Sequence, residues 1–334
     1  MRRIKLLILG VLCVAYSAIS QNKINGISFV SSREHATQAN VDKVVAVNAN
    51  HAAIMPFGFI KDLNSPNVVF NSDYQWYGET KQGVNQYIEI LKKNSIDIML
   101  KPQIWIAGGK YTGALKMKTE EEWQVLESSY LSFILTYAKI AEDAQVPIFC
   151  IGTELEKFVI NRPNYWKKLI AEVKKVYKGK LTYAANWDEY KRVSFWEQLD
   201  YIGVDAYFPI SLKKTPSVKE LQRGWQRWKN EIGVLSITKS RPVLFTEFGY
   251  RSIAYTANEP WKSDKNNKKP NFEAQVNATE AVFKEFWKEQ WFAGGYIWKW
   301  FIDYENSGGE FDNRFTPQNK PVENTIRSYF KEYE

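Results

Sequence analysis

Histidine and cysteine are scarce in this chain of 334 residues, and their scarcity limits the chemistry available to it. Neither His35 nor His51 has other ligand residues at the spacing typical of a metal site. His51 begins an apolar run, so we expect it to have a structural role. Neither a glycine-rich phosphate loop nor a serine nucleophile elbow is visible. We therefore predict a protein without a metal ion or cofactor.

The chain also lacks an apolar run long enough to span a bilayer, and its N-terminus instead resembles a secretion signal. Three basic residues precede the apolar stretch 6–15, and residues 18–20 form a small-x-small cleavage site. This pattern predicts a signal peptide over residues 1–20 and a single domain over residues 21–334. We expect a secreted or periplasmic protein.

The shortage of cysteine excludes a disulfide scaffold. Cys13 lies inside the predicted signal, and Leu12 precedes it where a lipoprotein carries a small residue, so a surface lipoprotein is less expected. Removal of the signal leaves Cys150 alone, so no internal disulfide can form. Cys150 lies within an apolar run and is expected to be an inert, packed thiol. Stability must then come from the core, since 45% of the residues are hydrophobic.

Basic residues exceed acidic ones, which gives a formal net charge of +8, but no arginine-rich block accompanies the excess. The predicted signal carries three of these positive charges. Lys262, Lys265, Lys268 and Lys269 lie in a polar stretch that is typical of a solvated surface. We therefore expect no nucleic-acid partner. We also expect no membrane span, and a monomer.

Aromatic side chains are abundant, with 13 Trp, 19 Tyr and 19 Phe. Most of them must pack in the core, but several are expected to line a groove and stack on flat ligand faces such as sugar rings. Trp105, Tyr111 and Trp261 are candidates for outer binding positions on loops, and ordinary loop packing is the alternative for each.

Apolar strand-like runs alternate with helical stretches along the chain. Eight candidate strands cover residues 24–30, 51–60, 96–106, 147–154, 180–188, 201–209, 242–250 and 292–301. Helical periodicity covers residues 84–93, 165–177, 218–232, 274–288 and 321–333. A further helix starts at a capping box formed by Thr119 and Glu122. Its apolar face consists of Trp123, Leu126, Tyr130, Phe133, Ile134 and Tyr137.

This alternation predicts an α/β fold, a single closed parallel (β/α)8 TIM barrel. Long polar loops follow the third, seventh and eighth strands, at residues 107–118, 251–270 and 303–320. All three would rim the face formed by the C-terminal strand ends, where barrel enzymes build their active sites. The loops are expected to turn that face into a cleft.

Two of the predicted strands carry a glutamate at their C-terminal end. Glu154 ends the run PIFCIGTE, and Glu247 lies in PVLFTEFGY. A carboxylate there loses hydration energy unless it has partners, so such a position usually has a function. The fourth and seventh strands lie nearly opposite each other in an eight-stranded barrel, so the two carboxylates can face one another. Such a pair suggests acid/base and nucleophilic work on a glycosidic bond.

Each glutamate also has an alternative interpretation. Glu154 can be a structural carboxylate paired with an arginine, and Glu247 a structural one too. Glu156 is an alternative acid, although two residues further on it leaves the strand. The stereochemical outcome depends on the separation of the carboxyls, about 5–5.5 Å for retention and about 6.5–9.5 Å for inversion.

Several segments together resemble glycoside hydrolase family 113, a clan-A family. They are MPFGF (55–59), KPQ (101–103), IGTEL (151–155), GVDAY (203–207), FTEFGY (245–250), GYIWKW (295–300) and FTP through KP (315–321). The resemblance spans roughly residues 24–330. It implies retaining hydrolysis of β-1,4-linked mannan or manno-oligosaccharides without a metal, of β-mannanase or exo-acting β-mannosidase type. By it, Glu154 corresponds to the acid/base and Glu247 to the nucleophile. Thr153 stands where many clan-A enzymes have an asparagine that binds the sugar 2-hydroxyl.

Two other functions stay open beside this one. The chain can be a retaining hydrolase of another β-linked glycan, or a catalytically silent carbohydrate-binding barrel. Polysaccharide or oligosaccharide is the expected substrate in each case. Whether the action is endo or exo depends on the rim loops, and the loop at residues 251–270 is the expected blocking element.

The remaining candidate substrate-binding residues lie at other strand ends. They are Lys101, Gln103, Thr153, Asn186, Trp187, Asp205, Tyr207 and Trp298. Tyr207 is expected to hydrogen-bond the nucleophile, and Trp298 to form a platform under the sugar, with Trp300 as its competitor. Lys101 and Asp205 can bind sugar hydroxyls or form a buried ion pair.

Overall fold

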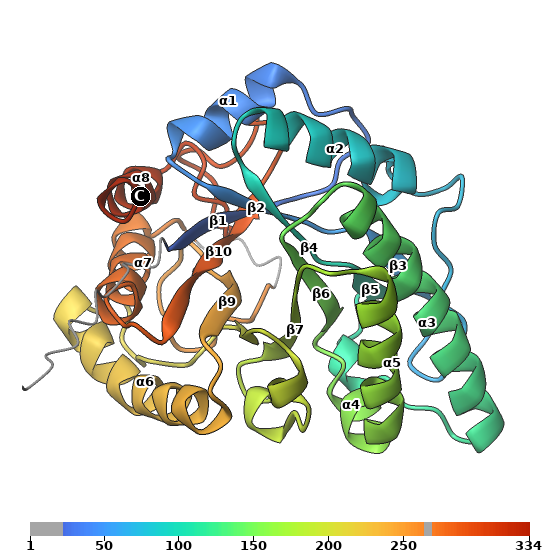
Figure 1. The fold of residues 1–334 in the computed structure, drawn as a ribbon. Helices are drawn as coiled ribbons and strands as arrows, with labels where there is room; N and C mark the ends of the chain where they lie inside the picture. The colour runs from blue at the N-terminus through green and yellow to red at the C-terminus, as the bar shows by residue number, and fades with distance from the viewer. Residues whose placement is uncertain (1–22, 264–268) are drawn as a thin grey trace, which may run out of the picture.

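The computed structural model describes residues 23–263 and 269–334. The predicted signal peptide, with Cys13 and its cleavage site, lies outside these residues. The described chain forms a closed barrel of eight parallel strands surrounded by helices (Figure 1). Its strands are β1 (Ile24–Phe29), β2 (His51–Ile54), β4 (Asp97–Leu100), β6 (Ile148–Thr153), β7 (Lys180–Asn186), β8 (Ile202–Asp205), β9 (Val243–Phe248) and β10 (Phe292–Trp300).

Each barrel strand pairs with its neighbours in chain order, and β10 pairs with β1 to close the ring. The predicted (β/α)8 barrel is therefore confirmed. The helices are α1 (Gln38–Ala46), α2 (Lys81–Lys93), α3 (Glu120–Asp143), α4 (Glu156–Asn161), α5 (Pro163–Val176), α6 (Val218–Lys239), α7 (Phe272–Phe286) and α8 (Pro321–Glu332). Short 3₁₀ turns are η1 (Tyr77–Glu79), η2 (Thr112–Ala114), η3 (Tyr190–Arg192) and η4 (Trp196–Gln198). None of the helices in these residues is long and apolar enough to cross a membrane.

Helix α3 follows the predicted pattern closely. The Thr119 hydroxyl accepts a hydrogen bond from the Glu122 N–H, and the Glu122 carboxylate accepts one from the Thr119 N–H, which completes the capping box. All six apolar residues predicted for its inner face are buried. Their burial against β6 and α5 fixes the helix that supports the end of β6.

The second and third predicted strands are each interrupted at a proline, so the prediction of two continuous strands was wrong in that detail. β2 stops before Pro56 and resumes as β3 (Phe57–Ile60), whereas β4 stops before Pro102 and resumes as β5 (Gln103–Ile106). Because proline has no N–H, Pro56 cannot donate to the neighbouring strand and Pro102 cannot donate toward β6. Strands β3 and β5 keep pairing with each other, which forms a two-stranded ribbon beyond the barrel.

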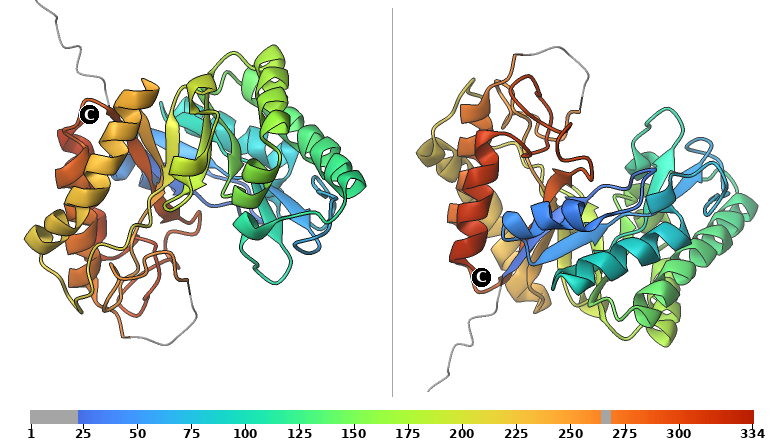
Figure 2. Two further views of the ribbon diagram at one scale, coloured as in Figure 1. Left: turned by 90° about the horizontal axis from the view of Figure 1, so that it is seen from below. Right: turned by 90° about the horizontal axis from the view of Figure 1, so that it is seen from above.

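The barrel interior is filled by a small set of buried side chains. They are Ile24, Ala53, Met99, Ile148, Cys150, Ala184, Tyr201, Leu244, Ala293 and Tyr296. Cys150 is a free thiol whose pKa burial raises to about 11, so it stays protonated and inert as expected. A larger apolar layer between strands and helices completes the core. Figure 2 shows the long connections after β9 and β10 at the end of the barrel opposite the C-terminus.

Candidate active site

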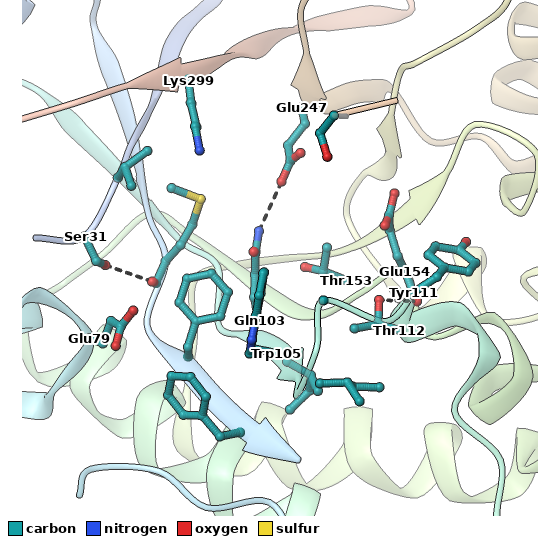
Figure 3. Close-up of a pocket in the computed structure, with 18 of the residues that line it drawn as sticks. Ser31, Glu79, Gln103, Trp105, Tyr111, Thr112, Thr153, Glu154, Glu247 and Lys299 are labelled. Atoms are coloured by element: carbon teal, nitrogen blue, oxygen red, sulfur yellow. Dashed lines mark hydrogen bonds between the residues drawn. The ribbon is translucent and has the colours of Figure 1, made fainter. Parts of the chain in front are cut away.

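Glu154 lies one residue beyond β6 in a constrained backbone conformation. Its φ is +50°, in the left-handed region that residues with a side chain rarely occupy. Three hydrogen bonds hold this conformation in place. The Glu154 N–H donates to the Ala184 carbonyl at 2.8 Å, and the Thr112 hydroxyl donates to the Glu154 carbonyl at 3.1 Å. The next N–H, of Leu155, donates to the Tyr183 hydroxyl at 2.7 Å. The turn aims the carboxyl into the barrel mouth (Figure 3).

Glu247 lies within β9, and donors surround both of its carboxylate oxygens. Lys101 Nζ lies 2.6 Å from Oε1, and Gln103 Nε2 lies 3.1 Å from the same atom. The Tyr207 hydroxyl donates to Oε2 at 2.9 Å. These contacts hold the carboxylate in one orientation. The predicted hydrogen bond from Tyr207 to Glu247 is present.

Lys101 and Asp205 form the buried ion pair that was one of their two predicted interpretations. Lys101 Nζ lies 3.2 Å from Asp205 Oδ1, and the Thr246 hydroxyl donates to that oxygen at 2.7 Å. Burial lowers the pKa of Lys101, but the carboxylates of Asp205 and Glu247 outweigh it and raise that pKa above its usual value. Burial and then the Glu247 charge raise the pKa of Asp205 to about 7, against the effect of Lys101.

The surroundings of Glu154 are different, because its carboxyl has no hydrogen-bond partner within the described chain. Burial raises the pKa of Glu154 well above its usual range, and the Asp205 and Glu247 carboxylates raise it further, against the opposing charge of Lys101. The two glutamates therefore face one site with contrasting environments. One is held by cationic and neutral donors, while the other is kept protonated.

Both glutamates line a cavity of about 660 Å³ at the barrel mouth. Gln103, Thr153, Asp205 and Trp298, four of the eight predicted substrate-binding residues, line it too. One wall is the β3–β5 ribbon, with Phe57, Phe59, Ile104, Trp105 and Ile106 among its lining residues. A cavity of this size, with an apolar and aromatic wall facing several polar and charged side chains, is typical of a small-molecule site.

The cavity has two ends that differ in composition. In Figure 3, Tyr111 and Thr112 lie beside Glu154 at one end, with Gln103 and Glu247 in the middle. Ser31, Glu79 and Lys299 lie at the other end.

Four of the eight predicted substrate-binding residues do not line the cavity. Lys101 and Tyr207 contact Glu247 from behind and therefore act on the site only by holding its carboxylate. Asn186 donates to the Tyr111 hydroxyl at 2.9 Å, so it supports a lining residue. Trp187 stacks on Trp261 with ring centroids 5.1 Å apart, away from the cavity lining.

The structure also separates several alternatives. Trp298 lines the cavity, whereas Trp300 is buried against Tyr304. Of the two tryptophans, it is therefore Trp298 that lies at the cavity, and its role as a platform stays a prediction. Glu156 begins α4, pairs with Arg192 and does not line the cavity, which leaves Glu154 as the carboxyl that faces Glu247.

Three charged cavity residues, Glu79, Lys110 and Lys299, were missed by the sequence reasoning. Burial raises the pKa of Glu79, whose carboxylate accepts a hydrogen bond from the Trp76 N–H at 3.2 Å. Burial lowers the pKa of Lys299, which has no hydrogen bond or ion pair within the described residues. The sequence carried a signal for Lys299, because this residue directly follows Trp298 in the segment GYIWKW (295–300), which resembles the family. Glu79 ends the short 3₁₀ turn η1, outside the predicted strands and helices, and carried no such signal.

Among residues 23–263 and 269–334, no group of three or more His, Cys, Asp or Glu side chains is arranged to hold a metal ion.

The barrel, with carboxylates at the ends of its fourth and seventh strands, has the arrangement of the clan-A glycoside hydrolases. The chain belongs to glycoside hydrolase family 113, since the model of that family matches residues 30–320. The comparison with curated protein sequences returned no match.

Solved structures show the same fold. A GH113 β-mannanase from Alicyclobacillus acidocaldarius, solved in complex with ManMIm, has a TM-score of 0.81 at 21% identity, over 94% of this chain and 98% of that one. A GH113 β-1,4-mannanase complex has a TM-score of 0.80 at 21% identity, over 93% and 99%. A β-glucuronidase from Faecalibacterium prausnitzii is more distant, with a TM-score of 0.59 at 13% identity, over 93% of this chain and 49% of that one.

Proposed function

We propose that the protein hydrolyses β-1,4-linked mannan or manno-oligosaccharides with retention, by double displacement through two glutamates. The observation that carries the proposal is the contrast between Glu154 and Glu247 across one cavity. Family membership and the similarity to two β-1,4-mannanases support mannan as the substrate.

The first step uses the protonated Glu154 carboxyl as the acid. It gives its proton to the glycosidic oxygen, while an oxygen of Glu247 attacks the anomeric carbon. The bond between that carbon and the leaving oxygen breaks, and a covalent glycosyl–Glu247 ester forms. The ordered carboxylate of Glu247, held by Lys101, Gln103 and Tyr207, suits this attack.

The second step needs Glu154 to act as a base. Formation of the ester removes the negative charge of Glu247, which is one of the charges that raise the pKa of Glu154. That pKa falls in the intermediate, so Glu154 remains ionised and takes a proton from water. The water attacks the anomeric carbon and releases Glu247 as a carboxylate.

The direct test is hydrolysis of mannan by the wild type, Glu154→Ala and Glu247→Ala. Each change should reduce kcat by at least about 10²–10⁴-fold, since it removes acid–base or nucleophilic catalysis. Glu156→Ala is the matched control, because Glu156 is a neighbouring glutamate outside the cavity. Near-wild-type turnover by Glu247→Ala would contradict the mechanism. Proton NMR of the first product should show the β-anomer, whereas an initial α-anomer would mean inversion.

Substrate and mode of action are tested separately. Initial rates on mannan, glucan, xylan and galactan distinguish a mannanase from a hydrolase of another β-linked glycan. A silent binding barrel would instead be retarded in mannan affinity gels and release no product. Mannose alone from mannohexaose would indicate exo action, whereas mixed oligomers would indicate endo action.

We also propose that the protein is exported and acts as a monomer. N-terminal sequencing of the exported protein should begin at Gln21, and light scattering should give the mass of one chain. An intact Met1 on protein recovered outside the cytoplasm would contradict the predicted cleavage.

A further inference from the structure

A second hollow of about 830 Å³ adjoins the catalytic cavity. It is formed by residues 71–77 and 80–82 together with Arg33. Tyr74 and Trp76 line both hollows, so the two hollows meet at these aromatic side chains. Its position is beyond the end of the cavity that holds Glu79, because Trp76 lies three residues before Glu79 and hydrogen-bonds its carboxylate.

The aromatic side chains at this junction are exposed but held by an ordered backbone. Tyr74 is 97% exposed and Trp76 is 44% exposed. The Trp76 carbonyl accepts from the Glu79 N–H at 2.9 Å, and the Gly78 N–H donates to Ser32 at 2.9 Å. The Arg33 guanidinium lies 5.8 Å from the centroid of the Trp76 ring. An exposed indole on an ordered backbone, beside polar groups, matches the stacked and hydrogen-bonding faces of a sugar ring.

The direction of the substrate follows from the roles of the two glutamates, so this inference rests on the proposed function. The leaving part of the substrate must lie beside Glu154, which protonates it. The part that becomes attached to Glu247 then extends toward the opposite end, past Glu79 and Lys299 and on to Trp76.

We propose that Trp76 and Tyr74, with Arg33 and Asp73, form a distal binding site for the non-reducing part of a glycan chain. The rings stack on sugar faces, while the guanidinium and carboxylate groups bind hydroxyls. The site extends the cleft beyond the catalytic cavity, so the enzyme is built for chains that continue on the non-reducing side of the cleaved bond.

The test compares Trp76→Ala and Tyr74→Ala on mannohexaose and on an aryl β-mannoside with a single sugar. Trp76→Ala should lower kcat/KM for mannohexaose about tenfold and leave the aryl mannoside within about twofold. Phe311→Ala is the matched control, because Phe311 is 86% exposed and lines neither hollow. An equal effect on both substrates, or none on either, overturns the distal site.

Failure of the proposed function gives a different result. A wild type that cleaves no mannoside contradicts the function but still permits a binding test in mannan affinity gels. Loss of retardation in Trp76→Ala and Tyr74→Ala would then support the distal site, and unchanged retardation would overturn it.

A second, independent observation concerns a buried glutamate behind Glu154. Glu189 is 1% exposed, and its Oε1 accepts a hydrogen bond from the Tyr183 hydroxyl at 2.7 Å. The same hydroxyl accepts from the Leu155 N–H at 2.7 Å, and Glu189 Oε2 accepts from the Asn186 N–H at 3.1 Å. A continuous chain of hydrogen bonds therefore joins Glu189 to the peptide that follows Glu154.

We infer that Glu189 is a positioning residue, which fixes the left-handed turn at Glu154 through Tyr183 and places a carboxylate behind it. Burial raises the pKa of Glu189 to about 7, and the Tyr183 and Asn186 hydrogen bonds lower it. Glu156 and Asp205 are the other charged groups facing Glu189. Those facing Glu154 are Asp205, Glu247, Lys101 and Glu189.

The test is the pH profile of kcat/KM for Glu189→Gln, which keeps the shape and removes the charge. Because the Glu189 charge raises the pKa of Glu154, the basic limb should move to lower pH. Tyr183→Phe removes the hydrogen bonds between Glu189 and the Leu155 N–H but keeps the Glu189 charge. In this variant kcat should fall, while the basic limb of the pH profile should move less than in Glu189→Gln. Unchanged profiles and kcat in both variants, with melting temperatures like the wild type, would overturn the role. A merely structural role would lower the melting temperature and leave the limb in place.

Discussion

Tyr207 lies two residues after β8 and donates a hydrogen bond to Glu247. Burial and the Glu247 charge raise the pKa of Tyr207 well above its usual value, so its hydroxyl stays protonated and can donate. The hydrogen bond to a carboxylate is of the strong kind. Tyr207 therefore orients the oxygen of Glu247 that Lys101 does not contact.

Tyr207→Phe should lower kcat by about 10- to 100-fold, since a hydrogen bond to a charged group contributes about 1.5–3 kcal/mol. Steady-state kinetics on manno-oligosaccharides measure the effect. Tyr250→Phe is the matched control, because the buried Tyr250 hydroxyl has no hydrogen-bond partner within the described residues. Equal kcat values for the two variants would contradict a role for Tyr207 in orienting Glu247.

The raised pKa of Glu154 predicts how activity depends on pH. The acid step needs the protonated carboxyl, so kcat/KM should fall only as pH rises through a pKa well above the usual value near 4.5. The measurement is the wild-type pH profile on mannohexaose, whose sugar leaving group needs the acid. An activated aryl glycoside departs without an acid, so the basic limb should be absent or much weaker on that substrate. An equally steep limb on both substrates would assign it to another group.

At the scale of elements, the order of strands was predictable and their interruptions were not. The apolar runs and the helical stretches between them predicted eight strands, because the strands of a parallel barrel bury side chains on both faces. Pro56 and Pro102 were visible in the sequence, but apolar periodicity continues through them. What ended β2 and β4 was the missing N–H of each proline, a property of the backbone that side-chain patterns do not report.

Strand packing makes Gly203 in β8 intolerant of a side chain. A Cβ there would lie 2.2 Å from the Tyr183 carbonyl oxygen and 2.5 Å from the Thr182 hydroxyl, both on β7. Gly203→Ala should therefore destabilise the protein by about 3 kcal/mol or more in urea denaturation. Gly233→Ala is the control, since its Cβ would be no closer than 3.4 Å to another side chain and alanine favours the helix. A Gly203→Ala variant as stable as the wild type would contradict this strand spacing.

At the scale of the whole molecule, the site is assembled from distant parts of the chain. Strand-end rules located Glu154, Glu247, Gln103, Asp205 and Trp298, because the C-terminal ends of all eight strands share one face. They did not locate Glu79 and Lys299, which lie 220 positions apart. The Gly78 N–H donates to the Ser32 carbonyl, which holds the turn of Glu79 beside the segment that follows β1, and β1 pairs with β10. No local pattern encodes this approach of Glu79 to Lys299.

The two long connections after β9 and β10 are tied together by a buried lysine. Lys320 Nζ forms an ion pair with Asp312 and donates to the Arg314 carbonyl at 2.9 Å and the Ser252 hydroxyl at 3.1 Å. Its side chain is completely buried. These buried contacts therefore hold the two connections together on that side of the cleft.

Lys320→Met should lower the free energy of unfolding by about 2 kcal/mol, since Asp312 and the Arg314 carbonyl lose a charged partner. It should also expose residues 303–320 to limited proteolysis, which mass spectrometry of the fragments would reveal. Lys331→Met, at an exposed position on α8, is the control. Identical fragment patterns for the two variants would mean that Lys320 does not hold the rim.

The β3–β5 ribbon gives the protein a separable module for specificity. Beyond Pro56 and Pro102 it forms a separate two-stranded sheet, which also bridges to Val69 through Phe59. Its side chains therefore form a wall of the cavity without belonging to the closed ring. Exchanges at Phe57, Phe59 or Trp105 can reshape that wall while the barrel register stays intact. In each chain segment, the stretch before the proline (β2 or β4) belongs to the barrel, and the stretch after it (β3 or β5) forms the cavity wall. The ribbon is therefore the natural target for redesign toward other glycans.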